Sequence, residues 1–258
     1  MSALDAAGFI ALGLVAGTYG TLIGVGGGLL VVPVLLMLHV APKEAAGTSM
    51  AVVLANAASG SLTYLRQRRV DVRAGFVFAL AGLPGTLLGG FADQYVHLRL
   101  FNLLFGLLLA VVGLRLFIQP GHDVAGDAPL AEERSTGGFR PLPAIAIGFA
   151  VGFLASIFGV GGGIIYVPSM VYLFSYPGHV ATATSTFIIA LTAIFGTASH
   201  AYYHDVLWVP ALFIAIGAIA GAQIGASIAP RVRGPNLLRL FSLAVFLAAA
   251  WLLYNALS

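Results

Sequence analysis

The stretch GVGGGLLVVP at residues 24–33 recurs as GVGGGIIYVP at residues 159–168, which is 135 positions further along the chain. Each copy interrupts a long apolar run, the first at residues 6–40 and the second at residues 142–176. Three glycines in a row weaken a helix, so each run divides into two helical pieces. The second piece has about a dozen residues and extends only ~18 Å, which is short of the ~30 Å hydrocarbon core of a membrane. The pattern predicts half-helices that meet inside a membrane, or a short hairpin of helices.

The composition is that of a chain surrounded by lipid. Hydrophobic residues make up 60% of the chain and charged residues 8%, whereas soluble domains carry about 25% charged residues. We therefore expect an all-α, polytopic integral membrane protein. The chain has no cysteine, which excludes disulfides and thiolate metal sites, and nothing in it indicates nucleic-acid binding. Uninterrupted apolar stretches of spanning length lie at residues 44–65, 73–93, 97–118, 179–203, 207–229 and 237–256.

The similarity of the two halves extends beyond the glycines. Thr48-Ser49 recurs as Thr184-Ser185 at an offset of 136 positions, and further matching glycines follow at the same offset. A single long polar stretch separates the two copies. The sequence therefore predicts two repeats of about five helical segments each. The expected boundaries are residues 1–118 for the first repeat, 119–140 for a cytoplasmic linker and 141–258 for the second repeat.

Basic residues predict how the two repeats lie in the membrane. The loop after the third segment is rich in arginine in the first repeat, whereas the matching loop of the second repeat carries His204 and Asp205. The next loop reverses this bias, so the positive-inside rule places the repeats upside down relative to each other. We expect a multi-pass protein of the cytoplasmic membrane, the inner one where there are two, with both termini outside. The arginines are Arg66, Arg68, Arg69 and Arg73, then Arg99 against Arg231, Arg233 and Arg239.

The duplicated glycine clusters are the first candidate binding site. Irregular backbone at membrane depth is tolerated where it is buried in protein or lines a cavity. The free N–H groups at the start of each half-helix, together with the helix dipole, favour an anion. Close helix packing is the alternative explanation for any single glycine. The candidate residues are Gly24, Gly26, Gly27, Gly28, Gly159, Gly161, Gly162 and Gly163.

Uncharged polar residues within the spans form a second set of candidate ligands for an anion. Ser49 and Asn56 are seven residues apart and share a helix face, as do Ser185 and Thr192. Hydroxyl and amide groups can hold an oxyanion without the cost of burying a charge. Hydrogen bonds between helices, or back to the same helix, are the alternative. The complete set is Thr48, Ser49, Asn56, Thr184, Ser185, Thr192 and Gln223.

No charged residue stands clearly at the centre of a span, which argues against a pump driven by a buried carboxylate. Asp93 and the histidines lie near the ends of spans, with His200 closest to a span interior. We find no catalytic constellation and no metal or cofactor motif, so an enzyme is not expected. Coupling to a proton or sodium gradient and the oligomeric state stay open.

The duplicated GxGGGxxxVP pattern at residues 24–33 and 159–168, with Thr48-Ser49 and Thr184-Ser185 downstream, resembles the sulfite exporter family TauE/SafE. The resemblance covers nearly the whole chain. It implies a permease for sulfite, sulfonates or related organosulfur anions. Inverted repeats with broken helices are typical of secondary carriers that work by alternating access. A passive anion channel, or a carrier of a different small anion, is the alternative.

Overall fold

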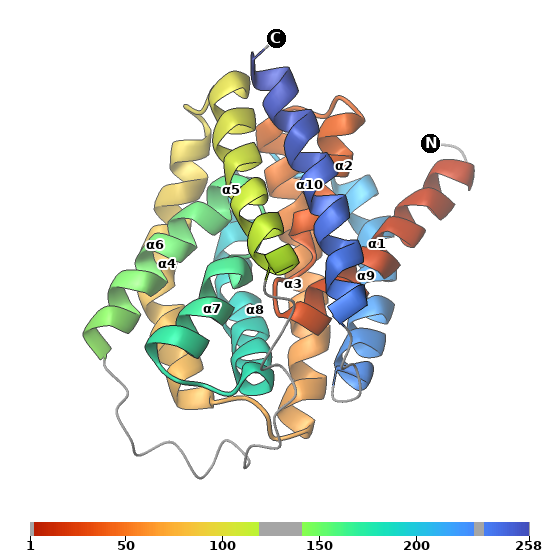
Figure 1. Cartoon of the computed structure of the whole chain (residues 1–258). Helices are drawn as coiled ribbons and strands as arrows, with labels where there is room; N and C mark the ends of the chain where they lie inside the picture. Colours follow the sequence, from red (N-terminus) through yellow and green to blue (C-terminus); the bar gives the residue numbers. More distant parts are fainter. Residues whose placement is uncertain (1–2, 119–140, 230–234, 258) are drawn as a thin grey trace.

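The computed structural model describes residues 3–118, 141–229 and 235–257, and all elements in these ranges are helices (Figure 1). This confirms the predicted all-α, polytopic architecture. The expected linker at residues 119–140 lies outside the described residues. The helices are α1 Ala3–Ile23, α2 Gly28–Met37, α3 Pro42–Arg66, α4 Val72–Asp93, α5 Leu98–Ile118, α6 Pro141–Phe158, α7 Gly163–Leu173, α8 Gly178–Tyr202, α9 Trp208–Ile228 and α10 Pro235–Leu257.

Four of the described helices are long and apolar enough to cross a membrane, namely Leu4–Ile23, Val72–Asp93, Gly178–Tyr202 and Trp208–Ile228. Large apolar side chains lie on the outer surface of the bundle; Leu80, Leu142 and Leu212 are 63%, 76% and 60% exposed. Such a surface would aggregate in water but suits a hydrocarbon solvent. The chain is therefore an integral membrane protein.

Helices α3 and α8 form the centre of the bundle and pack against each other. Helix α3 also contacts α9 and α2, and α8 contacts α4 and α7, so the neighbours of the two helices correspond under the offset between the halves. Their polar residues, including Ser49, Asn56 and Ser185, are fully buried in protein. A helix that faces other helices can carry such groups because protein partners satisfy them.

Two tight helix pairs flank this centre. Helix α9 packs against α1, and α4 packs against α6. A Cβ atom added at Gly221 of α9 would lie 2.3 Å from the Leu14 carbonyl oxygen, and one at Gly85 of α4 would lie 2.1 Å from that of Phe149. Gly85 and Gly221 are equivalent at the offset of 136. Both glycines let two helix backbones meet, as the small residues of membrane helices do.

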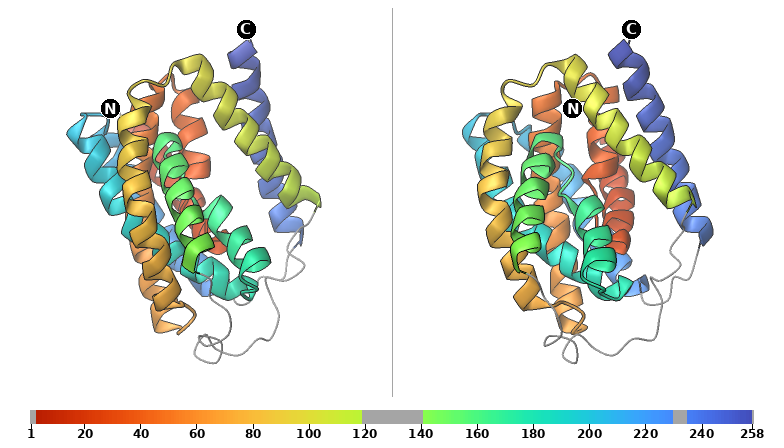
Figure 2. Two further views of the ribbon diagram at one scale, coloured as in Figure 1. Left: turned by 90° about the vertical axis from the view of Figure 1, so that its left-hand side faces the viewer. Right: turned by 60° about the vertical axis from the view of Figure 1, so that its left-hand side comes forward.

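The remaining pair, α5 and α10, lies along one side of the bundle (Figure 2). The two helices contact each other along their length, and Phe101 and Phe105 of α5 pack against Phe158 at the end of α6. This pair closes the side on which α6 ends and α7 begins.

Turns in the two halves repeat the same backbone geometry. The residues with positive φ other than glycine, among those described, are His39 and Ser175, with φ of 61° and 56°, and Arg68 and His204, with φ of 55° and 61°. Each pair is separated by 136 positions, so the duplication seen in the sequence is also present in local structure. That the halves cross the membrane in opposite directions stays a prediction.

Candidate functional site

The two glycine loops have the same conformation, and only glycine suits it. In the first loop Gly24, Gly26 and Gly27 have φ of 81°, 89° and 83°. In the second, Gly159, Gly161 and Gly162 have φ of 65°, 84° and 81°. An L-residue in the left-handed region costs roughly 1–2 kcal/mol. Three such positions in each loop explain why the sequence repeats glycine there.

The loops also contact each other at the centre of the protein. A Cβ atom at Gly28 would lie 2.3 Å from the carbonyl oxygen of Gly159, and one at Gly163 would lie 1.9 Å from that of Gly24. Glycine is therefore required on two grounds. The backbone conformation requires it at the positions with positive φ, and the contact between the loops requires it at Gly28 and Gly163. Helices α2 and α7 begin at this contact, so the first turns of the two half-helices lie close together.

Backbone N–H groups at these two helix starts have no carbonyl partner. Among the described residues, no backbone carbonyl accepts from the N–H groups of Gly27, Gly28 or Leu29. The same holds for the equivalent Gly162, Gly163 and Ile164. The first N–H groups of a helix lack intrahelical partners by geometry and carry the positive end of the helix dipole. Such helix starts are the kind of backbone site to which anions bind in proteins.

Asn56 adds a buried donor next to the first loop. Its side chain is fully buried, and its Oδ1 accepts a hydrogen bond of 3.2 Å from the Thr21 hydroxyl. Its Nδ2 has no partner among the described residues and lies 3.6 Å from the position of a Cβ atom at Gly27. A buried donor without an acceptor costs about 1–3 kcal/mol. An anion beside Gly27 would remove that cost.

Ser49 and Ser185 hold the loops in place. The Ser49 hydroxyl donates to the carbonyl oxygen of Gly159 at 2.7 Å, and the Ser185 hydroxyl donates to that of Gly24 at 2.8 Å. Each serine therefore fixes the loop of the other half. Both hydroxyl protons are engaged in these bonds. In this conformation the serines therefore position the loops and do not donate to a ligand.

Thr48 and Thr184 fix two turns away from the loops. The Thr48 hydroxyl accepts from the N–H of Leu207 at 2.9 Å, and that of Thr184 accepts from the N–H of Asp71 at 3.0 Å. The Tyr176 hydroxyl donates to the Asp71 carboxylate at 2.7 Å. Burial, followed by this hydrogen bond and the carboxylate charge, raises the pKa of Tyr176 above its usual range. The phenol therefore remains a donor.

Thr192 and Gln223 bond within the helix bundle. The Thr192 hydroxyl donates back to the Ile188 carbonyl of its own helix at 3.1 Å. Gln223 joins α9 to α3, because its amide donates to the Ser59 hydroxyl at 2.7 Å and accepts from Thr63 at 2.7 Å. These are the bonds within and between helices that the sequence left as the alternative to anion binding. Neither residue contributes a free donor to the glycine loops in this conformation.

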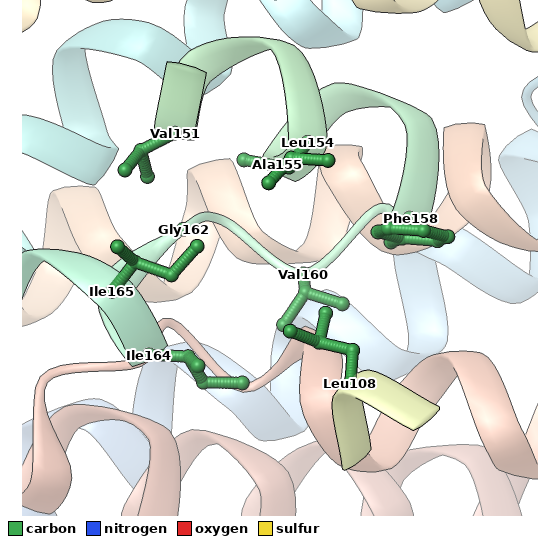
Figure 3. A pocket seen from close by; sticks show the side chains of 9 residues that line it. All are labelled: Leu108, Val151, Leu154, Ala155, Phe158, Val160, Gly162, Ile164 and Ile165. Carbon is green, nitrogen blue, oxygen red and sulfur yellow. The ribbon is translucent and has the colours of Figure 1, made fainter. Parts of the chain in front are cut away.

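A small, shallow hollow lies beside the second loop (Figure 3). Its walls are apolar and include Leu108 of α5, Phe158 of α6 and Ile164 of α7, with Gly162 at its edge. An anion gains nothing from these side chains. The polar face of the site therefore consists of the loop amides and Asn56.

One polar cluster was not expected from the sequence. Asp93 at the end of α4, His200 in the last turn of α8 and Asp205 in the turn before α9 come together, and each has one ligand atom within 4.8 Å of the others. All three are at most 2% exposed. In the sequence these residues lie near the ends of spans, where polar side chains are ordinarily expected to face water. More than a hundred residues separate Asp93 from the other two, and only the packing of α4 on α8 brings them together.

Comparisons with known proteins agree with the fold. The family model described as Sulfite exporter TauE/SafE matches residues 9–252. The chain is 33% identical to a Bacillus subtilis protein named "Probable membrane transporter protein YunE", over 95% of this chain and 96% of that protein. It is 30% identical to a "Probable membrane transporter protein" of Xylella fastidiosa, over 95% and 93% of the two chains. It is 27% identical to one from Methanocaldococcus jannaschii, over 88% of each. No solved structure gave a significant match.

Proposed function

Since the chain belongs to the sulfite exporter TauE/SafE family and is a membrane transport protein, we propose that it is a secondary carrier of small sulfur-containing oxyanions such as sulfite or organosulfonates. Its role is transport rather than catalysis. The anion binds where the two glycine loops meet. The single observation that carries this proposal is the pair of half-helix starts at Gly27–Leu29 and at Gly162–Ile164, whose first N–H groups have no carbonyl partner within the described part of the chain.

The chemistry of this site suits an oxyanion. Several oxygen atoms of sulfite or of a sulfonate group can each accept one hydrogen bond, and the site offers short rows of N–H donors and the Asn56 amide. Hydrogen bonds to a charged acceptor are roughly twice as strong as those between neutral groups. Among the described residues, those that form the site include no arginine or lysine, so the site can bind an anion and still release it. A transporter needs both steps.

Contact between the loops favours a carrier over a channel. The backbones of Gly28 and Gly159 leave no room even for a Cβ atom, so no open passage runs between them in this conformation. A channel needs a continuous path, whereas a carrier passes through a closed state. In the proposed cycle, movement of one half against the other uncovers the loop amides alternately on the two sides of the membrane.

The proposed orientation places the protein in the cytoplasmic membrane with both termini outside. The first turn of α1 and the last turn of α10 lie in the upper part of Figure 1, and the turn that joins α3 to α4 lies at its lower end. That turn carries the exposed Arg68, and Arg66 and Arg69 flank it. Under the positive-inside rule, this arginine-rich end faces the cytoplasm.

The test is flux into liposomes that contain the purified protein. We expect accumulation of ³⁵S-labelled sulfite, and competition by unlabelled taurine or sulfoacetate when these are substrates. Liposomes without protein, and liposomes with an unrelated membrane protein, set the background. Absence of flux for every sulfur oxyanion tested, under an imposed gradient of the anion, of protons and of sodium, would contradict the proposal.

The same liposomes separate a carrier from a passive channel. A carrier exchanges internal for external anion, saturates, and can move the anion against its gradient when a proton or sodium gradient is imposed. A channel only dissipates the anion gradient, at a rate that follows the membrane potential. If the protein only dissipates the anion gradient, it is a channel and not a carrier. That result would not by itself show whether the anion binds at the glycine loops.

A further inference from the structure

We propose that Asp93, His200 and Asp205 form a binding site for one divalent transition-metal ion such as Zn²⁺, at the end of the bundle where α4 and α8 finish. None of these residues belongs to the glycine loops, and the proposal does not depend on which anion is carried. One ligand atom from each residue lies within 4.8 Å of the others. The three side chains are 2%, 0% and 1% exposed.

Two of the three side chains have buried acceptor atoms without partners. Both carboxylate oxygens of Asp93 lack a hydrogen bond to any described residue, and so does Nδ1 of His200. The adjacent Ser156 hydroxyl, fully buried, has no partner either. Leaving a buried carboxylate without any donor is costly, far more so than leaving a neutral group. Ligand atoms of Asp93, His200 and Asp205 lie within 4.8 Å of one another, so a single cation can contact all three side chains.

The orientation of His200 fits a metal ligand. Its Nε2 lies 3.0 Å from the carbonyl oxygen of Ser156 and can only donate there, which leaves the lone pair on Nδ1. The Nδ1 atom lies 3.9 Å from Oδ2 of Asp205, which is also a hydrogen-bond acceptor. Histidines that bind metals commonly donate their other N–H to a backbone carbonyl, which fixes the ring and its tautomer.

The spacing of His200 and Asp205 and the types of ligand favour a metal ion. A proton joins two atoms that are about 2.5–3.2 Å apart, so His200 and Asp205, at 3.9 Å, do not share one. A metal ion at ~2.0–2.2 Å from each ligand fits ligand atoms that lie 3–4 Å apart. A donor set of one imidazole nitrogen and two carboxylates favours first-row transition metals over Mg²⁺ and Ca²⁺.

Two further side chains support Asp205 from the outside. Gln94 donates to its Oδ2, and the Lys43 ammonium lies 3.6 Å from its Oδ1. The Lys43 side chain is 49% exposed and can turn toward solvent. With His200 neutral and both carboxyl groups ionised, as in a metal-binding state, the two carboxylates and one ammonium sum to a charge of −1. The local field therefore still attracts a cation with Lys43 in place.

The equivalent positions of the other half show that this cluster is not part of the shared scaffold. At the offset of 136, the position equivalent to His200 is Tyr64, that of Asp205 is Arg69 and that of Asp93 is Ala229. The Tyr64 hydroxyl donates to the carbonyl of Thr21, which corresponds to Ser156, so a tyrosine makes the same structural bond as the imidazole. What His200 adds is the second nitrogen, which points toward the two carboxylates.

The experiment measures Zn²⁺ binding by the full-length protein after treatment with a chelator, in detergent, by isothermal titration calorimetry and elemental analysis. We expect one Zn²⁺ per chain, with Mg²⁺ unable to compete. Asp93→Asn and His200→Gln should each weaken binding roughly 100-fold or more, because removal of a direct ligand costs more than the ~10–100-fold loss for a supporting residue. His204→Gln removes an exposed imidazole next to the cluster and should leave binding unchanged.

Zinc K-edge absorption of the unmodified protein provides a reading that needs no variant, and it should show one nitrogen and carboxylate oxygens at ~2.0–2.2 Å. Failure of the unmodified protein to retain Zn²⁺ would overturn the proposal. So would binding that Asp93→Asn and His200→Gln leave unchanged. A protonated-carboxyl infrared band that disappears in Asp93→Asn, in protein that binds no Zn²⁺, would show that a proton fills the cluster instead.

Discussion

The hydroxyl of Ser49 donates a hydrogen bond of 2.7 Å to the backbone carbonyl of Gly159, which lies 110 positions further along the chain. Its counterpart in the other half, Ser185, makes the equivalent bond to Gly24 at 2.8 Å. Each central helix thus holds the glycine loop of the other half. The position of each loop depends on contacts made by both halves, so a rearrangement of one half affects both loops.

Ser49→Ala and Ser185→Ala should each destabilise the protein by roughly 1–3 kcal/mol, because a buried carbonyl loses its donor. The thermal unfolding midpoint in detergent should fall by a few degrees for either variant. Thr18→Val is the matched control, since Thr18 lies on α1 and its hydroxyl donates to the Leu14 carbonyl one turn before it, within the same helix. An unchanged midpoint in both serine variants would show that these bonds do not hold the loops.

Gly27→Val and Gly162→Val should abolish anion flux. Their φ values of 83° and 81° are unfavourable for valine, and a side chain would displace the neighbouring loop amides. Gly8→Val is the control, because nothing lies within 4 Å of a Cβ atom at Gly8. The liposome assay measures all three after size-exclusion chromatography has shown that each is folded. Normal flux in both loop variants would remove the glycine loops from the mechanism.

Asn56 should contribute to anion affinity through its Nδ2 group. Asn56→Ala removes the donor and should raise the apparent KM for the anion about tenfold, which corresponds to ~1.4 kcal/mol. Asn56→Asp replaces the donor with a negative charge and should reduce flux further. Asn255→Asp makes the same change at an exposed residue that bonds within α10. If the KM values of the Asn56 variants match that of the original protein, Asn56 does not bind the anion.

The orientation of the two halves can be measured because the chain has no cysteine. Arg68 and His204 are equivalent exposed residues in left-handed turns, with φ of 55° and 61°. Arg68→Cys should react with a membrane-impermeant maleimide only after the cells are opened, whereas His204→Cys should react in intact cells. Labelling of both from the same side would contradict the predicted inversion of the repeats.

Much of this fold could be predicted from the sequence, because lipid imposes strong rules. The duplicated GVGGG clusters predicted the breaks between α1 and α2 and between α6 and α7, and the structure has α2 and α7 beginning at Gly28 and Gly163. The low charge content predicted a polytopic helical protein. These features depend on local composition and on the length needed to span a bilayer, which are readable without knowledge of tertiary contacts.

The roles of individual polar residues were less accessible. The sequence cannot tell whether a buried hydroxyl faces a ligand or a neighbouring helix, and Thr48, Thr184 and Gln223 turned out to bond to protein groups. The meeting of Asp93 with His200 depends on the packing of α4 against α8. Such contacts are set by helix rotation and crossing, which a hydropathy pattern leaves undetermined.

In the proposed mechanism, backbone amides at the two half-helix starts bind the transported anion. The most direct measurement is a sulfite titration of ¹⁵N-glycine-labelled protein in nanodiscs, followed by NMR, with resonances assigned by single substitutions. We expect saturable shifts for the amides of Gly27, Gly28, Gly162 and Gly163, and none for Gly8. If sulfite is transported while those four resonances do not shift, the anion binds elsewhere and the glycine loops are not its site.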